Sequence, residues 1–351
     1  MAEVSKKNGA LGLPVTRGSF QIAGFVNGTE SDRFYTDAKT RTGKARRAVN
    51  FAVTFDTDKK QYVEASGMEQ EFAYFSKSEL DKNTGKRVNE TIKVEWRDRK
   101  KPQGDFQPIG IACGLETRLD ETGSTKNKIT NLVNFDACEY LADNLHDDMP
   151  VLVTGNLTYS NYEGKHYKKC EVNRVMLSRR NLDFDDPTFE PTCEFSQRIV
   201  FTSIEQAEDK TKFIVNAKIV AYNSIEDVEF FVYNPELAKI IRKKLKPYNA
   251  VNVAGYINIV KNETSDDEDS WWGVCHEIKR APTIVEFVID GVDPKTLDVE
   301  TYSEANINDA IAKANANRQA KEDFGEKETD TPWGKAVPKS FDDETDEEDE
   351  W

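Results

Sequence analysis

The sequence is short of the residues and motifs from which most catalytic and metal centres are built. Its three histidines lie far apart, at His146, His166 and His276, and its five cysteines contain no CxxC pair. Neither a zinc site nor a disulfide framework is therefore indicated. The motifs GxSxG, GxxxxGK(S/T) and GxGxxG are absent, which excludes the nucleophile elbow and the common phosphate-binding loops. We expect a protein that is not an enzyme and that uses no metal or cofactor.

Long apolar runs are also missing. No stretch is long enough for a transmembrane helix, and the N-terminus, MAEVSKKNGALGLP, lacks the apolar core of a secretory signal. Charged residues make up 32% of the chain, which predicts a very soluble protein. Because the cysteines form no obvious pairs, we expect a reducing, cytoplasmic setting.

The acidic net charge of −15 is unevenly distributed along the 351 residues. Residues 1–181 carry 29 Lys+Arg and 25 Asp+Glu, a net +4. Residues 182–296 carry 13 and 21, a net −8, and residues 297–351 carry 6 and 17, a net −11. Because binding follows the local patch and not the mean, the acidic total does not exclude a polyanionic ligand for the first part.

The stretch Val151–Leu177 predicts a long β-hairpin. Val151, Val153, Gly155, Leu157 and Tyr159 share one parity, the period of a half-buried strand. A glycine-containing turn follows, and the next residues alternate in the same way. Three tyrosines, one histidine and three lysines crowd the tip, where they offer rings for stacking and cations for phosphates. The structural alternative is a solvated hairpin whose tyrosines pack on the domain's own surface.

Two halves with the same order of elements are predicted. In the first half, strands are expected at Gly18–Asn27, Val49–Phe55, Gln61–Phe75, Arg87–Trp96 and Phe106–Leu119, then a helix at Asn134–Asn144 before the hairpin. In the second half they are expected at Ser196–Thr202, Lys212–Tyr222, Val251–Val260 and Trp271–Lys279, with a helix at Glu236–Leu245. VLVTGNLTYS at residue 151 and VNVAGYINIV at residue 251 share V-x-V-x-G and an apolar seventh residue. We infer two copies of one β-rich domain.

The expected organisation follows from this repeat. It consists of a flexible arm (1–15), a first domain with insertions (16–181), an acidic linker with two prolines (182–191), a second domain (192–296), a partly helical and then disordered segment (297–340) and an acidic tail (341–351). The weak helix lies at Tyr302–Lys313.

Three basic clusters in the first domain adjoin aromatic residues, a combination suited to a single-strand groove. They are Arg41–Arg47, Arg97–Lys101 and Lys165–Lys169. The candidate nucleic-acid-binding residues are Arg41, Lys44, Arg46, Arg47, Trp96, Arg97, Lys100, Tyr159, Tyr162, Lys165, His166, Tyr167, Lys168 and Lys169. Trp96 also has a structural interpretation as a core residue. In the second half, the corresponding loop NETSDDEDSWW is acidic, so we expect DNA contact chiefly in the first domain.

The order of strands, helix and closing hairpin is that of an OB-fold, a five-stranded Greek-key barrel. Val151–Leu177 resembles the last two strands of a single-stranded DNA-binding protein, through V-x-V-x-G-x-L, the aromatic Gly-Lys turn and the closing V-x-R-V. The chain is also similar to that family in its polar linker and acidic terminal peptide. The resemblance is to the virus-encoded members with tandem OB-folds.

The resemblance implies two OB-fold domains that bind and protect single-stranded DNA during replication, repair or recombination, in the host cytoplasm if virus-encoded. It also implies that the tail recruits partner proteins, through Asp342, Asp343, Asp346, Glu347, Glu348, Asp349, Glu350 and Trp351. Bacterial tails of the family end in Pro-Phe, whereas this chain ends in Glu350-Trp351, so its partners are expected to differ.

Two other classes of function remain open at this point. An acidic protein that mimics DNA and regulates a nucleic-acid enzyme would need acidity spread over the folded part, and the second domain alone fits that requirement. A metal-dependent nuclease hidden among the many carboxylates is the other, and it lacks any recognisable site.

Overall fold

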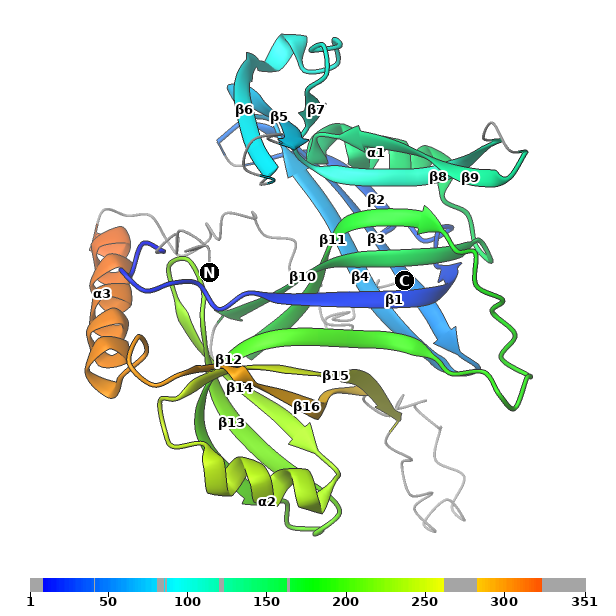
Figure 1. Ribbon diagram of the computed structural model, residues 1–351. Helices are drawn as coiled ribbons and strands as arrows, with labels where there is room; N and C mark the ends of the chain where they lie inside the picture. Colours follow the sequence, from blue (N-terminus) through cyan, green and yellow to red (C-terminus); the bar gives the residue numbers. More distant parts are fainter. Residues whose placement is uncertain are drawn as a thin grey trace, which may run out of the picture. The chain divides into compact units, whose positions relative to one another are not determined.

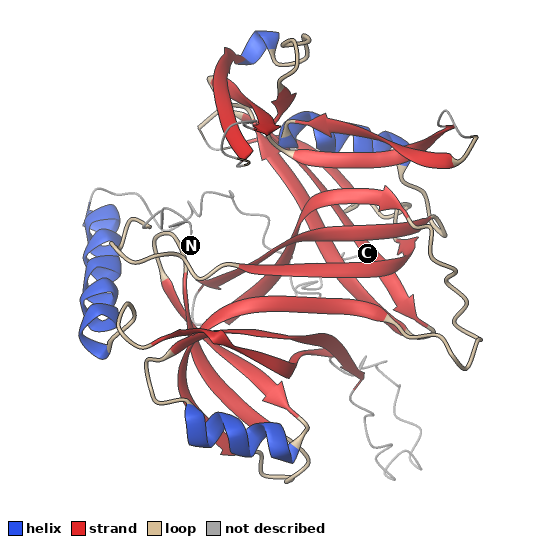
Figure 2. Ribbon diagram, viewed as in Figure 1, coloured by secondary structure: helices blue, strands red, loops and turns tan. Residues whose placement is uncertain are grey.

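The computed structural model describes residues 9–40, 42–80, 85, 87–119, 123–162, 165–261 and 283–323. Strands dominate, and three α-helices accompany them within these ranges (Figure 1, Figure 2). The described residues up to Ala314 form one compact unit, to which the contacts below belong, and the described residues from Asn315 onward belong to a second.

The first barrel is closed by five strands. They are β1 (Gly18–Asn27), β3 (Ala45–Asp56), β4 (Lys59–Met68), β10 (Pro150–Tyr162) and β11 (Lys165–Leu177). β1 pairs antiparallel with β3 and β10, β3 pairs with β4, and β10 pairs with β11. A parallel bridge between Glu64 of β4 and Glu171 of β11 completes the ring. Helix α1 (Asn134–Asn144) lies in sequence between β4 and β10, as the OB-fold requires.

The second barrel repeats this plan. Its strands are β12 (Thr192–Gln206), β13 (Phe213–Val220), β14 (Ile225–Val232), β15 (Ala250–Lys261) and β16 (Thr283–Asp298), with helix α2 (Pro235–Lys244) between β14 and β15. The pairings correspond one to one, including the parallel bridge, here between Phe231 and Val288. The prediction of a mainly β protein with two OB-fold barrels is confirmed.

The shared V-x-V-x-G motif holds the same place in both barrels. Gly155 faces Phe20 across β10 and β1, and Gly255 faces Phe195 across β15 and β12. Each glycine adjoins a β-bulge. A Cβ on Gly155 would lie 1.9 Å from the carbonyl oxygen of Glu171, and one on Gly255 would lie 1.9 Å from that of Val288. The strands therefore approach too closely for any residue but glycine.

The barrels are joined through their first strands. β1 and β12 pair antiparallel, and Phe20 is paired with Phe195, its counterpart in the other barrel. In addition, β10 lies beside β14, and β15 lies beside β4. Each closing hairpin therefore approaches the third strand of the opposite barrel, an arrangement with approximate two-fold symmetry.

A large insertion separates β4 from α1. It contains β5 (Phe72–Leu80), β6 (Arg87–Glu95), the short 3₁₀ helix η1 (Trp96–Asp98), β7 (Gln107–Pro108), β8 (Ile111–Leu119) and β9 (Thr125–Leu132), while β2 (Tyr35–Lys39) precedes β3. The single strand predicted at Gln61–Phe75 is wrong, because the chain leaves the barrel after Met68 and starts a separate sheet at Phe72. Gly67 marks this exit: a Cβ there would lie 2.2 Å from the amide nitrogen of Phe135 in α1.

The N-terminal segment is not a flexible arm over its described part. Leu11 and Leu13 are buried in a small core with Tyr302, Ile307 and Ala310. The amide of Ala10 donates to the carbonyl of Tyr222 at 2.8 Å. Helix α3 (Glu304–Asp323) supplies part of this core and is longer than the predicted helix at Tyr302–Lys313. Among the described residues, no helix is both long and apolar enough to cross a membrane.

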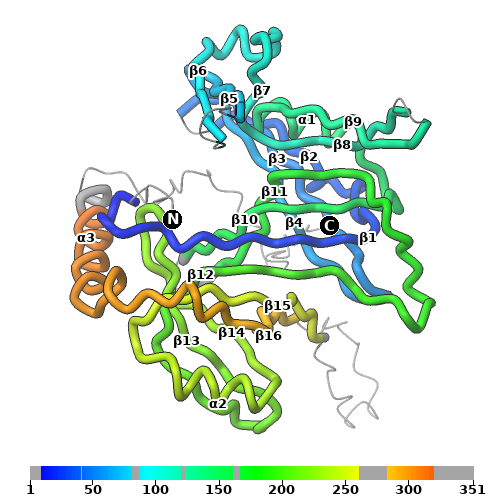
Figure 3. The backbone as a smooth tube through the Cα atoms, viewed as in Figure 1, coloured from blue at the N-terminus to red at the C-terminus, as the bar shows by residue number. Residues whose placement is uncertain are grey.

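Some predictions fall outside the described residues. They are the strand at Trp271–Lys279 with the acidic loop NETSDDEDSWW before it, the disordered segment predicted within 297–340 beyond residue 323, and the acidic tail at 341–351. The described strand that closes the second barrel is β16, which starts at Thr283. The connection at 182–191 contains no strand or helix and runs as a loop from β11 to β12 (Figure 3). Phe184 within it packs edge-on against Phe25, with ring centroids 5.4 Å apart.

The described cysteines should be inert toward thiol reagents in the folded protein. Burial raises the pKa of the Cys113, Cys138 and Cys170 thiols to about 12 and that of Cys193 well above its usual value. At pH 8 these thiols stay protonated, and the thiolate is the reactive form. We expect peptide mass spectrometry after iodoacetamide treatment to find all four unmodified in the native protein and modified in urea. Equal labelling in both states would contradict the burial.

Candidate nucleic-acid interface

The first predicted basic cluster is largely bound up in ion pairs. Arg47 donates from Nε to Asp37 and from Nη1 to Glu139, both at 2.9 Å, and its guanidinium lies 4.3 Å from the centre of the Phe135 ring. Arg46 donates to Glu64 at 3.2 Å, and its side chain is 13% exposed. Arg47 therefore ties β2 and β3 to α1. Lys44 is exposed in the turn before β3, and Arg41 lies outside the described residues.

The second cluster fastens the insertion to α1. Trp96 is half-buried, with its ring edge-on to Phe135 at 5.8 Å and the Arg99 guanidinium 4.4 Å from its centre. Arg99 in turn makes two hydrogen bonds with Asp136, at 2.9 and 3.0 Å. The structural interpretation of Trp96 is therefore supported, and its indole has little free face for stacking on a base.

The remaining cations of this cluster are also paired, although more exposed. Lys100 lies 3.6 Å from Asp136 and 3.5 Å from Glu139. Arg97 is 79% exposed and lies 2.7 Å from Glu95. An exposed ion pair of this kind contributes little to stability and is easily broken, so Arg97 remains available to a phosphate.

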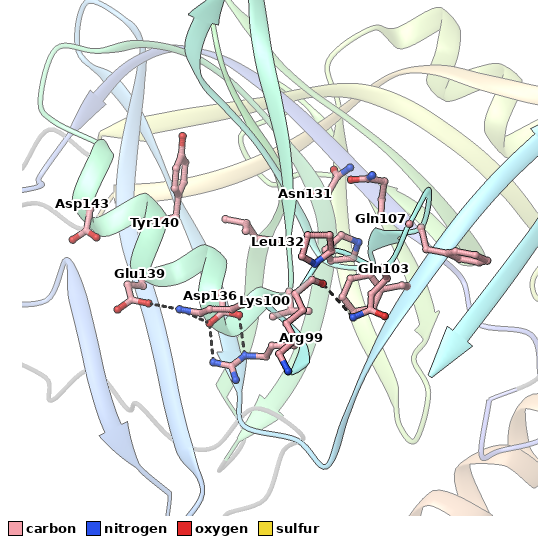
Figure 4. A pocket seen from close by; sticks show the side chains of 17 residues that line it. Arg99, Lys100, Gln103, Gln107, Asn131, Leu132, Asp136, Glu139, Tyr140 and Asp143 are labelled. Atoms are coloured by element: carbon pink, nitrogen blue, oxygen red, sulfur yellow. Dashed lines mark hydrogen bonds and ion pairs between the residues drawn. The ribbon is translucent and has the colours of Figure 1, made fainter. Parts of the chain in front are cut away.

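A cavity of about 560 Å³ opens between α1 and residues 99–108 of the insertion (Figure 4). Phe75, Phe106 and Leu132 are among its apolar lining. Its charged lining is balanced, with three cations and three carboxylates: Arg99, Lys100, Lys101, Asp136, Glu139 and Asp143. Figure 4 shows Arg99 and Lys100 directed at Asp136 and Glu139. The balance gives no net attraction for a phosphate.

In the closing hairpin β10–β11, one residue that was predicted to stack on bases is buried. Tyr159 is 8% exposed within the barrel core, and burial raises the pKa of its phenol far above the usual value. Its assignment as a stacking residue is therefore wrong: it occupies the inward parity of β10 with Leu157. Tyr162, Lys165 and His166 belong to the two strands, but their side chains lie outside the description.

Two adjacent lysines of β11 contact different strands, one in each barrel. Lys169 is bonded to Glu64 on β4 at 3.0 Å. Lys168 donates to the carbonyl of Glu229 on β14 at 3.2 Å and lies 5.1 Å from the centre of the Phe287 ring. Burial lowers the pKa of the Lys168 ammonium. The hairpin is therefore docked on the second barrel close to its tip, where Lys168 pairs with Tyr159.

A hollow of about 500 Å³ lies where hairpin and second barrel meet. Ser160, Tyr167 and Lys168 line it from the hairpin, and Asn216, Asp227 and Glu229 line it from β13 and β14. It brings a ring, a cation and several hydrogen-bonding groups together, from segments that are about 60 residues apart in sequence.

The outer face of β3 and β4, here called the strand face of barrel 1, carries exposed residues that were not among the candidates from the sequence. On β4, Lys60, Tyr62 and Glu64 point outward, between the buried Gln61, Val63 and Ala65. Tyr62 is 64% exposed, and the Lys60 ammonium lies 5.8 Å from its ring centre. The alternation of polar and apolar residues in Lys60–Ala65 was the available signal. It places Tyr62 among the outward residues.

The corresponding outer face of β13 and β14, the strand face of barrel 2, also carries a lysine beside an aromatic ring and an exposed tyrosine. Lys212 lies 4.7 Å from the centre of the Phe231 ring, and Tyr233 follows on the same side of the chain, 39% exposed. Lys212 and the Tyr233 hydroxyl both bond the buried carboxylate of Glu286. Burial and that hydrogen bond raise the pKa of Tyr233 to about 12. Asp227 and Glu229 make this face more acidic than that of barrel 1.

No metal centre appears in the described ranges, where no three His, Cys, Asp or Glu side chains gather to hold an ion.

Comparison with protein families gives a match over most of the chain. A family model described as YorF covers residues 20–327. The chain belongs to the YorF family. A comparison of this YorF chain with the sequences of curated proteins gives no significant match.

Among solved structures, the YorF chain is similar to the single-stranded DNA-binding protein from Thermus aquaticus. A deletion mutant of that protein has a TM-score of 0.36 and 10% identity, over 80% of this chain and 94% of that one. The wild-type protein has a TM-score of 0.34 and 11% identity, over 79% and 91%. A replication protein A heterotrimer bound to single-stranded DNA has a TM-score of 0.20 and 8% identity, over 84% and 97%. Likenesses this weak carry no argument about function, and a virus-encoded type stays a prediction.

Proposed function

We propose that this protein binds single-stranded DNA without sequence preference and has no catalytic role. The observation that carries the proposal is the exposed ring of Tyr62 beside Lys60, on the outer face of the second and third strands of an OB barrel. That face is the one on which OB-folds bind oligonucleotides. A ring and a cation there match the two chemical parts of a single strand, the base and the phosphate.

In the proposed mechanism, the contacts that give affinity do not depend on the identity of the bases. Tyr62 stacks on a base through its π-face, which every base possesses, so no base is preferred. Arg46 and Lys169 both pair with the carboxylate of Glu64, so a phosphate that takes the place of Glu64 meets two cations. Phosphates attracted there release their counterions, which makes binding dependent on salt.

A role in replication, repair or recombination belongs to the same proposal. There the protein would cover exposed single strands while the acidic tail, Asp342–Trp351, recruits partner proteins. The tail lies outside the described residues, and its role rests on its eight carboxylates and terminal aromatic. A basic pocket on a partner would take the Trp351 ring together with its carboxylate.

The alternative of an acidic DNA mimic gains some support from Asp227 and Glu229, which face outward on β14. A mimic would bind a nucleic-acid enzyme and not DNA itself.

Titration with oligo-dT distinguishes the two proposals. We expect intrinsic fluorescence to be quenched on binding, with an affinity that falls as salt rises and that exceeds the affinity for a duplex of equal length. The duplex is the control, because its bases cannot stack on protein rings. Absence of binding at low salt would refute the proposal and favour the mimic.

A further inference from the structure

Helix α2 presents a cationic face that neither strand face explains. Arg242 and Lys243 follow Lys239 by three and four residues, so the three share one side of the helix, and Lys246 lies in the turn after it. All four are exposed. The one carboxylate in α2, that of Glu236, is bonded to Lys239 at 2.7 Å.

The other three cations differ from those of the first barrel in their surroundings. Within the described ranges, Arg242, Lys243 and Lys246 have no carboxylate at ion-pair distance, whereas Arg46 and Arg47 are both paired. Cations in the last turn of a helix commonly offset its dipole. Lys246 lies beyond the helix end at Lys244, so the dipole does not account for the whole row.

The cationic face meets barrel 2 at the start of β13. The Arg242 guanidinium lies 5.9 Å from the ring centre of Phe213, the first residue of β13. The preceding residue, Lys212, lies 4.7 Å from the ring of Phe231 on that strand face. Phe213 has the inward parity of β13 and packs against the core, whereas Lys212 precedes it on the outward parity, so Arg242 and Lys212 lie on either side of the start of β13. Ile240 on the same helix is 57% exposed.

We propose that α2 is a second contact surface for the backbone of single-stranded nucleic acid. A strand leaving the strand face of barrel 2 beside Lys212 passes the start of β13 and Arg242 and lies with its phosphates along the cationic face. Because α2 contains no aromatic residue, this surface contributes affinity and salt dependence but no stacking. The proposal rests on the proposed function and extends nucleic-acid contact to the second barrel, where the acidic composition predicted little.

The test is a triple variant, Arg242→Gln, Lys243→Gln and Lys246→Gln, compared with wild type in salt titrations. Glutamine has a helix propensity close to those of lysine and arginine, so α2 should fold normally. For a long oligo-dT of about 60 nucleotides, the log–log slope of affinity against salt should fall by about 2, since each phosphate of a single strand that is no longer neutralised lowers the slope by about 0.7. An oligo-dT of about 8 nucleotides, within the span of one OB-fold, should bind the variant and wild type equally.

The control variant is Arg87→Gln, Arg118→Gln and Lys128→Gln, which removes three exposed cations of the insertion and should leave the slope unchanged. An unchanged slope for the α2 variant on the long oligonucleotide, with normal wild-type binding, would overturn the inference and leave the proposed function intact. If the slope fell equally in the control variant and in the α2 variant, the inference would also be overturned. So would an effect that vanishes when Asp342–Trp351 is deleted, since the tail would then be the occupant. Wild-type protein that binds neither oligonucleotide would instead refute the proposed function.

Discussion

Replacing Tyr62 by alanine should weaken oligo-dT binding by a factor of roughly 5 to 150, the equivalent of about 1–3 kcal/mol for one stacked base. The ring is 64% exposed, so its removal leaves no cavity in the core and should hardly change the free energy of unfolding. Affinity is measured by fluorescence titration and stability by urea unfolding. The combination of weaker binding and unchanged stability is the result expected of a contact residue.

Two further variants sharpen this prediction. Tyr62→Phe keeps the π-face and should bind nearly as well as wild type. Tyr74→Ala removes another exposed tyrosine, on β5 of the insertion and 47% exposed, and should leave affinity unchanged. If Tyr62→Ala bound oligo-dT as tightly as wild type, the strand face of barrel 1 would not be the binding surface.

Replacing Asp136 by alanine should lower the free energy of unfolding by about 3 kcal/mol, the lower end of the cost of breaking a buried ion pair. Asp136 is 6% exposed and accepts two hydrogen bonds from Arg99. Its loss leaves the Arg99 guanidinium, 16% exposed, against Trp96 and without its carboxylate. Urea unfolding at pH 7 measures the change.

The matched control is Glu95→Ala, which breaks the exposed pair with Arg97. We expect it to cost less than about 1 kcal/mol. Equal losses for the two variants would contradict a structural role for the Arg99–Asp136 pair. Short oligo-dT should still bind folded Asp136→Ala, because the side chains bonded to Asp136 are those of Arg99 and Lys100 in the insertion.

The fold was largely predictable because its signals are local and occur twice. The alternation in Val151–Leu177 predicted β10 and β11 almost to the residue, and the helix at Asn134–Asn144 matches α1. The second V-x-V-x-G segment then predicted a second barrel. Gly155 and Gly255 explain why this short motif is reliable, since both hold a bulge where a Cβ would strike a carbonyl oxygen.

The candidate site was predicted less well. Clusters of cations beside aromatics are visible in sequence, but their partners come from elsewhere in the chain. Arg47 pairs with Glu139, 92 residues away, and Lys169 pairs with Glu64, 105 residues away. Tyr159 was misjudged because its position near the hairpin tip was given more weight than its inward parity.

The sequence by itself determined the β-rich class, the duplication and the absence of familiar catalytic motifs, because periodicity and motif spacing need no knowledge of distant contacts. Only the tertiary structure decided which charged and aromatic groups remain free. Ion pairing and burial depend on strands that meet in the folded barrels. The ion pairs of Arg46 and Arg47 and the burial of Tyr159 show that these side chains stabilise the fold. The same contacts leave Tyr62 and the cations of α2 exposed for binding.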